Sequence, residues 1–535
     1  MFLRKLASRY NRYNFYSFLT LFLLTSPHNF THGQESDTST EARDPLYCYK
    51  PESEFYKDPS LRVPSPKVSI PTSISEFSEE HVDDNFNDKK DVTAILFQWK
   101  YRDIARECEE VLAPQGYGYV QVAPVQEYSV GEQWWRSYQP VSHKIGSRQG
   151  SEEDFDEMVL RCKAAGVGVI VDAVINHMGT GTKGVNLNGS LGSVYQKYEY
   201  PNLYSSKNFH HCNNGHRDLL RNFSDRYELQ QCELYNLADL DTSQPEVQSR
   251  ITDFLQLLVS KGVSGLRIDA AKHIDTKELE KILSKVRARI IQEVTVECDD
   301  GVKPMEYVPG GRVYSFQAAR DITNFFMNDG ISYLAKPVPF GEDWGEDYMP
   351  SSHSQVFVTN WDLERGKERY LRWDMEPKIY LLAQTFLLVW GYGQVDVFSS
   401  YNFKTKDDNA PKGEFECGRN SWRCEHRHPM ILGAIQLRSA SAGQPVLNIL
   451  TEGTQRLAFN RGTTAFIAIN NYDSEWNLEG NPVGLPLPST GKQYYNVLNS
   501  KGKKEAVQVR MSESGDEVVW GNVTIPSRAA IGIFI

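Results

Sequence analysis

The chain has 535 residues, of which 40% are hydrophobic and 24% are charged, and its formal net charge is −11. This length accommodates two or three domains with a sizeable core. The acidic balance excludes a general binder of nucleic acids or anionic membranes, because phosphate recognition needs a basic face.

The N-terminus has the pattern of a secretory signal. Four basic residues, Arg4, Lys5, Arg9 and Arg12, precede the apolar run "FYSFLTLFLL". That run is too short to span a bilayer comfortably, so we predict a signal peptide over residues 1–33 and a secreted, extracellular protein. The alternative is an uncleaved anchor at the cell surface. No later segment is apolar enough for a membrane helix, and residues 34–91 predict a weakly structured extension.

Eight cysteines are present, and in an oxidising compartment they should pair. The sequence contains neither a C-x-x-C motif nor zinc-type His/Cys spacing, which favours structural disulfides over a zinc site. Asn188, Asn222 and Asn522 each open an N-x-[ST] sequon, which is consistent with glycosylated surface loops.

From residue 92 onward, apolar strands alternate with amphipathic helices. The first pairs are "VTAILFQW" with "YRDIARECEEVL", and "GYVQVAPV" with "SEEDFDEMVLRCKAAG". The alternation continues through "VGVIVDAVINH", "VSGLRIDAA" and "ARIIQEV" to "GQVDVFSSY". Buried parallel strands in this order predict an α/β fold, a closed (β/α)₈ TIM barrel.

Two regions interrupt or follow this rhythm. Residues 178–240 are rich in Asn, Gly and Tyr, and we predict an inserted subdomain after strand three. The last ninety or so residues show short alternating strands such as "FIAINN" and "EVVWGNVTI". The predicted domains are therefore a catalytic barrel over 92–177 and 241–444, the insertion, and a C-terminal antiparallel β-sandwich over 445–535.

Acidic residues lie where predicted barrel strands end. They are Asp269, Glu293 and Asp362, with Asp172 as a fourth. One such acid is usually a helix cap or an ion-pair member, but barrel chemistry is built at this rim. A pair of carboxylates about 5–5.5 Å apart suits retaining glycoside cleavage, with one as nucleophile and the other as acid/base. Asp269 and Glu293 on neighbouring strands fit that spacing.

Strand alternation places Arg267 on the same face as Asp269. A cation there predicts an ionised Asp269 with a lowered pKa. Glu293 follows the apolar Ile290 and Ile291, and a drier position predicts a raised pKa that suits an acid.

Four ordered motifs carry a family resemblance. "DAVINH", "GLRIDAAKH", "IIQEV" and "VFVTNWD" resemble the signature regions of the α-amylase family, glycoside hydrolase family 13. "GYVQVAPVQE", "WWRSYQPVSHKI" and "CEHRH" resemble animal-type members in particular, and the resemblance runs from about Val92 to the C-terminus. It implies that Asp269 is the nucleophile, Glu293 the acid/base and Asp362 the third acid.

The resemblance also implies a set of substrate-binding residues. The positions that line the substrate site in that family correspond here to Trp134, Trp135, Tyr138, His177, Arg267, Lys272, His273 and Trp361. The two tryptophans and Tyr138 would form an aromatic platform for glucose rings. The alternative is a buried tryptophan pair inside a loop.

One structural Ca²⁺ is implied between the barrel and the insertion. Its ligands would be the side chains of Asn176 and Asp239 and the backbone carbonyls of Gln230 and His273. Such hard oxygen donors suit calcium. Matching positions imply the disulfides Cys108–Cys162, Cys212–Cys232 and Cys417–Cys424, and leave Cys48 and Cys298 either paired with each other or free.

Two departures from the family pattern stand out. Trp361 replaces the usual His before the third acid, and an indole stacks on sugar but takes no charge. We expect altered turnover, pH profile or glucan preference, tested by Trp361→His. Asp396 occupies the place of a chloride-binding arginine, although Arg267 and Asn360 match two other chloride-binding positions. Activity should therefore not require chloride.

The sequence thus predicts a secreted, monomeric, retaining hydrolase of internal α-1,4-glucosidic bonds in starch, glycogen and maltooligosaccharides. Its partners would be these α-glucans, with no nucleic acid and no transmembrane segment. Two alternatives remain: a transglycosylase on the same fold, and a non-catalytic protein that binds glycans or a partner. All three acids are present, whereas non-catalytic relatives normally lose at least one.

Overall fold

The computed structural model describes residues 90–296, 300–366, 370–413, 415–418, 422–503 and 505–535. The predicted signal segment, nearly all of the predicted extension, and both Cys48 and Cys298 lie outside the described residues. Within the described part of the chain, no helix is long and apolar enough to cross a membrane.

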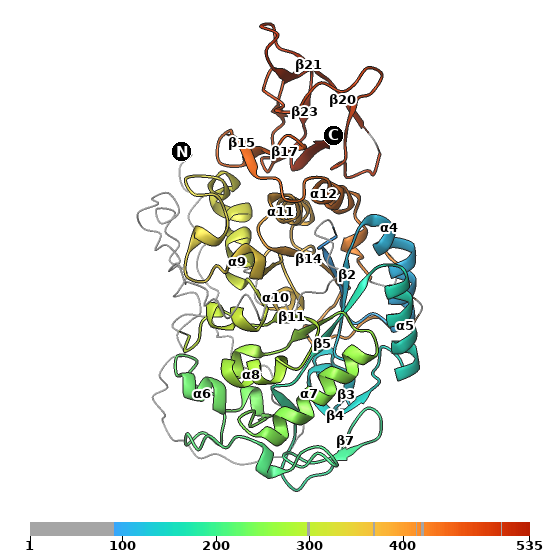
Figure 1. Ribbon diagram of the computed structural model, residues 1–535, viewed down its shortest axis with the longest axis vertical. Helices are drawn as coiled ribbons and strands as arrows, with labels where there is room; N and C mark the ends of the chain where they lie inside the picture. The colour runs from blue at the N-terminus through green and yellow to red at the C-terminus, as the bar shows by residue number, and fades with distance from the viewer. Residues whose placement is uncertain (1–89, 297–299, 367–369, 414, 419–421, 504) are drawn as a thin grey trace, which may run out of the picture. The chain divides into compact units, whose positions relative to one another are not determined.

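Eight parallel strands form a closed barrel, which confirms the predicted fold class. Around the barrel the strands follow their order in the chain, and the last strand, β14, pairs with the first, β1. Figure 1 shows these strands within a surrounding layer of helices. The strands are β1 Thr93–Leu96, β2 Tyr119–Val122, β5 Gly168–Ala173, β10 Gly265–Ile268, β11 Arg289–Gln292, β12 Arg312–Tyr314, β13 Ser354–Val356 and β14 Gln394–Ser399.

A helix follows almost every barrel strand and covers its outer face. Helix α5 (Glu152–Ala164) lies within the predicted helical segment, and Ser151 and Asp154 form a reciprocal capping box at its first turn. Between β11 and β12, the described residues form a 3₁₀ helix, η8 (Pro304–Gly310), in place of an α-helix. The other covering helices are α3 Tyr101–Glu107 with its continuations η3 Cys108–Leu112 and α4 Ala113–Gln115, α5 Glu152–Ala164, α7 Pro245–Ser260, α8 Thr276–Leu283, α9 Phe316–Asn324, α11 Pro377–Trp390 and α12 Pro429–Ala440.

Two excursions extend the barrel at its carboxyl-end rim. After β2, the hairpin β3 (Gln126–Tyr128) and β4 (Pro140–Ile145) carries a short 3₁₀ helix, η4 (Trp134–Tyr138). After β5, the chain leaves the barrel through the insertion and returns in antiparallel pairing, so that His177 lies opposite Asp239. The elements of the insertion are β6 His177–Thr180, β7 Leu187–Asn188, β8 Val194–Tyr195, α6 Arg226–Gln231 and β9 Leu237–Asp239.

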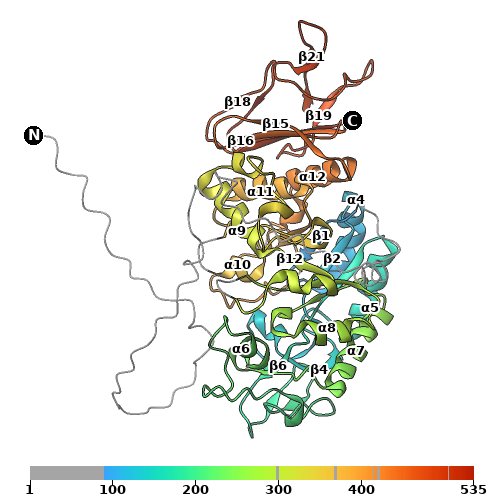
Figure 2. The ribbon, with the colours of Figure 1, turned by 60° about the vertical axis from the view of Figure 1, so that its left-hand side comes forward.

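The C-terminal strands form an antiparallel sheet with shorter strand pairs packed against it, as predicted. The strand pairs share a buried core with the sheet around Phe466, Trp476 and Trp520. Figure 2 shows this sheet next to α11 and α12. The sheet is β15 Val446–Thr451, β16 Arg456–Arg461, β17 Ala465–Asn470 and β24 Ala529–Phe534, and the pairs are β18 Trp476–Asn477 with β23 Thr524–Ile525, β19 Tyr494–Asn496 with β20 Glu505–Val507, and β21 Val509–Met511 with β22 Val518–Trp520.

Among the residues that the structure describes, three disulfides are present, in the predicted pairings. Cys108–Cys162 joins the helical layer after β1 to α5, and Cys212–Cys232 closes a loop inside the insertion. Cys417–Cys424 closes a short loop after β14. Each bridge therefore fixes a segment outside the barrel strands.

Candidate functional site

The predicted acids meet at the carboxyl ends of neighbouring strands. Asp269 comes directly after β10 and Glu293 directly after β11, and β10 and β11 are paired. Asp172 lies inside β5, in register with Arg267 on β10. Asp362 does not end a strand. It lies in the first turn of α10 (Trp361–Arg365), six residues beyond the end of β13.

The guanidinium of Arg267 holds three carboxylates together. Its Nη1 donates to Asp172 Oδ1 at 2.8 Å and to Asp269 Oδ1 at 2.5 Å. Its Nη2 lies 2.6 Å from Glu293 Oε1. Because both nitrogens belong to one rigid fork, the carboxylates of Asp269 and Glu293 face the same small volume.

A strained backbone position fixes the second oxygen of Glu293. Ala270 has a positive φ of 49°, in the left-handed region that residues other than glycine seldom adopt. In this conformation its N–H donates to Glu293 Oε2 at 2.9 Å. Strain of this kind persists where the surrounding structure enforces it, and it is common in active sites.

One guanidinium does not balance the surrounding acids, and burial dominates their titration. Burial raises the pKa of Asp172 to about 7, against the attraction of Arg267. Desolvation by the surrounding site, followed by the charge of Glu293, raises the pKa of Asp362 to about 7, even though part of the residue's surface reaches solvent. The pKa of Glu293 is raised by burial, as predicted. The predicted lowering for Asp269 is wrong: burial raises its pKa, and Arg267 only partly offsets this.

The predicted aromatic platform is partly covered by protein. Trp134 is 8% exposed, and its Nε1 donates to the carbonyl of Lys406 at 2.7 Å. Trp135 is half-buried, its Nε1 donates to Asp407 Oδ1 at 3.0 Å, and the Arg136 guanidinium lies 4.6 Å from its ring. A loop after β14 thus holds both indoles in place.

Tyr138 and His177 link the hairpin to the acids. The Tyr138 hydroxyl donates to Asp172 Oδ2 at 2.8 Å. His177 Nε2 lies 3.0 Å from the Tyr138 carbonyl, and burial lowers the pKa of His177 to about 4. The neutral ring therefore donates its Nε2–H to that carbonyl.

Lys272 and His273 are bound by protein groups. Lys272 is 1% exposed, and its Nζ donates to Asp300 Oδ2 at 2.8 Å and to Thr295 Oγ1 at 3.2 Å. His273 Nδ1 lies 2.9 Å from the Leu229 carbonyl. The Lys272 side chain thus forms a buried ion pair beneath the loop that follows β11.

Trp361 is buried beside Arg267. Trp361 is only 3% exposed, and its ring stacks on that of Phe97 with 5.5 Å between the centroids and 2° between the planes. Tyr138 stacks on it at 6.2 Å, and the guanidinium carbon of Arg267 lies 5.1 Å from its centroid. The indole is thus packed by protein groups, whereas the sequence suggested an indole open to a sugar ring.

The predicted calcium ligands lie where the insertion joins the barrel. Asn176 Nδ2 is 3.2 Å from Asp239 Oδ1, and His210 Nδ1 is 2.7 Å from Asp239 Oδ2. Gln230 Nε2 donates to the Ile274 carbonyl, which places α6 against the segment after β10. Among the residues that the structure describes, no group of three or more His, Cys, Asp or Glu side chains could hold a metal ion.

These residues nevertheless fit a hard cation by their donor chemistry. Burial raises the pKa of Asp239 to about 6, partly offset by His210. A buried carboxylate of this kind gains from a cation beside it. A flip of the Asn176 side-chain amide would exchange its Nδ2 and Oδ1 and bring Oδ1 towards Asp239. A cation between Asn176 Oδ1 and the Asp239 carboxylate would stabilise that arrangement.

Sequence reasoning missed the role of Arg365. Its guanidinium lies within 4.4–5.5 Å of four aromatic rings, those of Phe97, Trp134, Tyr401 and Phe403. All four rings come from segments far from Arg365 in the chain, so no local pattern points to the contact. The position of Arg365, three residues after the third acid, was the only signal.

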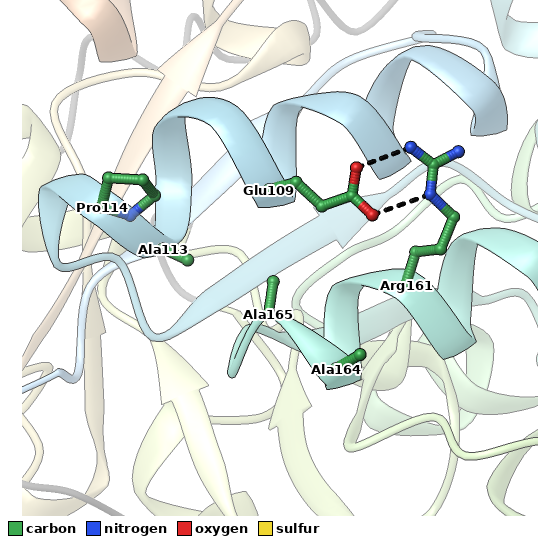
Figure 3. A pocket seen from close by; sticks show the side chains of 6 residues that line it. All are labelled: Glu109, Ala113, Pro114, Arg161, Ala164 and Ala165. Carbon is green, nitrogen blue, oxygen red and sulfur yellow. Dashed lines mark hydrogen bonds and ion pairs between the residues drawn. The ribbon is translucent and has the colours of Figure 1, made fainter.

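A surface cavity lies away from these acids. Its volume is about 380 Å³, and it lies between helix α5 and the helical segment that follows β1. Figure 3 shows the ion pair of Arg161 with Glu109 at one side of it, and alanines and Pro114 on the others. The one acid that lines this cavity, Glu109, is paired with Arg161 at 2.7 and 2.9 Å. The cavity therefore lacks the pair of neighbouring carboxylates found at the barrel rim.

A closed (β/α)₈ barrel with clustered acids at its carboxyl rim is typical of glycoside hydrolases. The family profile "Alpha amylase, catalytic domain" matches residues 133–326. An α-amylase of Streptomyces violaceus is 41% identical over 391 residues, which cover 72% of this chain and 66% of that protein. The chain therefore spans slightly less than two thirds of that bacterial relative.

Two animal proteins are similar over most of their length. The α-amylase-related protein of Drosophila melanogaster is 35% identical over 416 residues, covering 72% of this chain and 82% of that protein. The crystal structure of α-amylase I from Eisenia fetida matches with a TM-score of 0.77 and 31% identity, covering 84% and 97% of the two chains. A mutant of that enzyme has been solved in complex with maltohexaose. The chain belongs to the α-amylase family of glycoside hydrolases.

Proposed function

We propose that this protein hydrolyses internal α-1,4-glucosidic bonds of starch-type glucans with retention of configuration. The observation that carries the proposal is the single guanidinium of Arg267 shared by Asp269 and Glu293. A shared fork favours the short carboxylate spacing of retaining enzymes, about 5–5.5 Å, over the wider spacing of inverting ones. The complex of the Eisenia fetida enzyme with maltohexaose supports the substrate class.

In this proposal Asp269 attacks the anomeric carbon, and Glu293 gives its proton to the leaving glucosidic oxygen. The C–O bond to the leaving sugar breaks as the ester to Asp269 forms. Glu293, now ionised, takes a proton from water, and that water releases the sugar from Asp269. Because two adjacent buried acids beside one cation resist full ionisation, the pair retains a proton that Glu293 can donate.

The neighbouring residues position these two acids. Arg267 keeps both carboxylates in place, and the N–H of Ala270 fixes the orientation of Glu293. Tyr138 ties Asp172 to the hairpin that carries the tryptophans. Asp362, the most exposed of the acids, is placed to accept hydrogen bonds from hydroxyls of the bound ring.

We also propose that Asn176, Asp239 and the carbonyls of Gln230 and His273 hold one Ca²⁺. The ion would supply a positive charge that joins the insertion to the barrel.

Chloride is not required in this proposal. The carboxylate of Asp396 is buried in β14, where Gln355 Nε2 donates to its Oδ1 at 2.5 Å, and an acid there repels an anion. Secretion is proposed from the N-terminal signal pattern.

The test is release of reducing ends from soluble starch by the wild type, by Glu293→Gln and by Glu110→Gln. Glu110 is an exposed acid on the helical layer and serves as the matched control. We expect Glu293→Gln to lose at least about 100-fold in rate, since a general acid contributes about that much or more. Glu110→Gln should match the wild type. Full activity of Glu293→Gln would refute the assignment.

A further inference from the structure

We propose that Trp361 is a positioning residue that holds Arg267 against the catalytic acids and keeps water from its guanidinium. This inference rests on the proposed function. It starts from the place of the indole, which lies over the one cation that binds Asp269 and Glu293. A guanidinium over a tryptophan face is attracted by the ring, and more strongly where water is excluded.

The indole is in turn supported by a column of rings. Trp361 is stacked on Phe97, and Phe97 is stacked on Tyr401 at 5.8 Å with 7° between planes. These rings come from α10 and from the ends of β1 and β14, which are adjacent strands. The Arg365 guanidinium lies 4.8 Å from the Phe97 ring and 4.9 Å from that of Tyr401. Trp361 is therefore held from behind by rigid elements.

The polar atoms of Arg267 show what the ring contributes. Nη1 and Nη2 bind carboxylates, whereas Nε is buried and has no hydrogen-bond partner among the described protein atoms. An unpaired N–H attracts water wherever water can enter. The indole occupies part of the space next to this guanidinium and so limits entry. With the site dry, Arg267 stays in one place and the acids keep their raised pKa values.

Charged and titratable groups from several elements surround this guanidinium and its carboxylates. Those that bind it or act on it are Asp172, Asp269, Glu293 and Tyr138. Asp362 interacts with Glu293, Asp269 and Arg365, and His177 interacts with Glu293. Trp361 has no charge at any pH, so its removal changes their environment without adding a titrating group.

The experiment compares the pH profile of kcat/KM for the wild type, Trp361→Leu, Trp361→Phe and Phe97→Leu on soluble starch. Leucine is apolar but offers no ring face, whereas phenylalanine keeps one. In Trp361→Leu we expect the alkaline limb, which reports the acid in the free enzyme, to move down by about one pH unit as water lowers the pKa of Glu293. Trp361→Phe should keep the wild-type limb, and Phe97→Leu should move it less than Trp361→Leu does.

The proposal would be overturned if the alkaline limb of the kcat/KM profile of Trp361→Leu superimposed on that of the wild type. It would also be overturned if Trp361→Phe showed the same shift as Trp361→Leu. Absence of turnover by the wild type would instead refute the proposed function. The pH dependence of Tm then decides about Trp361. Buried acids with raised pKa values make Tm fall between about pH 5 and about pH 8. This fall should be flattest in Trp361→Leu, less flattened in Phe97→Leu and unchanged in Trp361→Phe, and identical slopes in all variants would overturn the inference.

Discussion

Two buried acid clusters, one on the helical layer around Glu107 and one at the barrel strands around Arg267, behave in opposite ways. Glu107 on α3 is 2% exposed, and it binds His426 Nε2 at 2.7 Å and the guanidinium of Arg427. Burial alone would raise its pKa, but these partners outweigh burial and the pKa is lowered. Around Arg267, three carboxylates share one cation and their pKa values are raised.

The difference separates structure from chemistry. The first cluster has a donor for each oxygen of Glu107, and it ties α3 to the segment after β14. The second cluster has more negative charge than its cation balances, so it retains protons near neutral pH. An unbalanced cluster at a barrel rim is suited to proton transfer, whereas a balanced one is suited to stability.

The largest effect should come from removing the shared cation. Arg267→Ala leaves three buried carboxylates without a counter-charge, and we expect turnover on starch to fall by at least about 1,000-fold, since acid/base catalysis and positioning are both lost. Initial rates of reducing-end release measure this. Arg427→Ala removes a cation from the balanced cluster and should leave kcat within about twofold of wild type. Comparable losses of kcat in both variants would contradict the distinction.

Glu107→Gln should affect stability and leave catalysis intact. The substitution leaves Arg427 and the buried His426 without their carboxylate, and breaking a buried pair in this way costs about 3 kcal/mol of the free energy of unfolding. Chemical denaturation measures that cost. A stable variant with reduced kcat/KM would show that this cluster contributes to the active site after all.

The two clusters predict opposite slopes of stability against pH. Glu107 has a lowered pKa in the folded state, so its contribution is present at neutral pH and is lost as pH falls. Asp172, with a pKa of about 7 against an ordinary value of 3.8, contributes stability at low pH that is lost as pH rises towards 7.

Calorimetric Tm values between about pH 4 and about pH 8 test these slopes. Asp172→Asn should flatten the fall of Tm on the alkaline side, and Glu107→Gln should flatten the fall on the acid side. An unchanged alkaline slope in Asp172→Asn would show that other groups set it.

Calcium removal should have a smaller effect. A chelator leaves Asp239 with His210 and Asn176 as partners, so we expect the insertion to loosen and Tm to fall by several degrees. Added Ca²⁺ should restore Tm in the wild type and not in Asp239→Ala. A Tm that is the same with and without chelator would refute the proposed site.

Chloride removal should have the smallest effect, none on kcat/KM. Burial raises the pKa of Asp396 to about 7 and Gln355 partly offsets this, so near neutral pH the group is either neutral or negative. Neither form attracts an anion. Dialysis against a chloride-free buffer tests this, with return of chloride as the control. Activity that depends on chloride would contradict the role given to Asp396.

Particular residues show how far sequence reasoning reached. The barrel, the cap of α5 at Ser151 and the three disulfide pairings were all predictable, because they depend on local patterns or on an ordered family resemblance. The meeting of Asp269 with Glu293 was predictable too, since adjacent parallel strands end at one rim. The direction of the Asp269 pKa was not, because it depends on how much water the fold excludes.

The sequence by itself determined that Asp269 and Glu293 follow successive barrel strands, because strand pattern and chain order are properties of neighbouring residues. Only the tertiary structure decided that Trp361 covers Arg267 and that Lys272 is paired with Asp300. These contacts join segments distant along the chain, and their strength depends on burial. Burial results from the packing of the whole barrel, so no single motif specifies it.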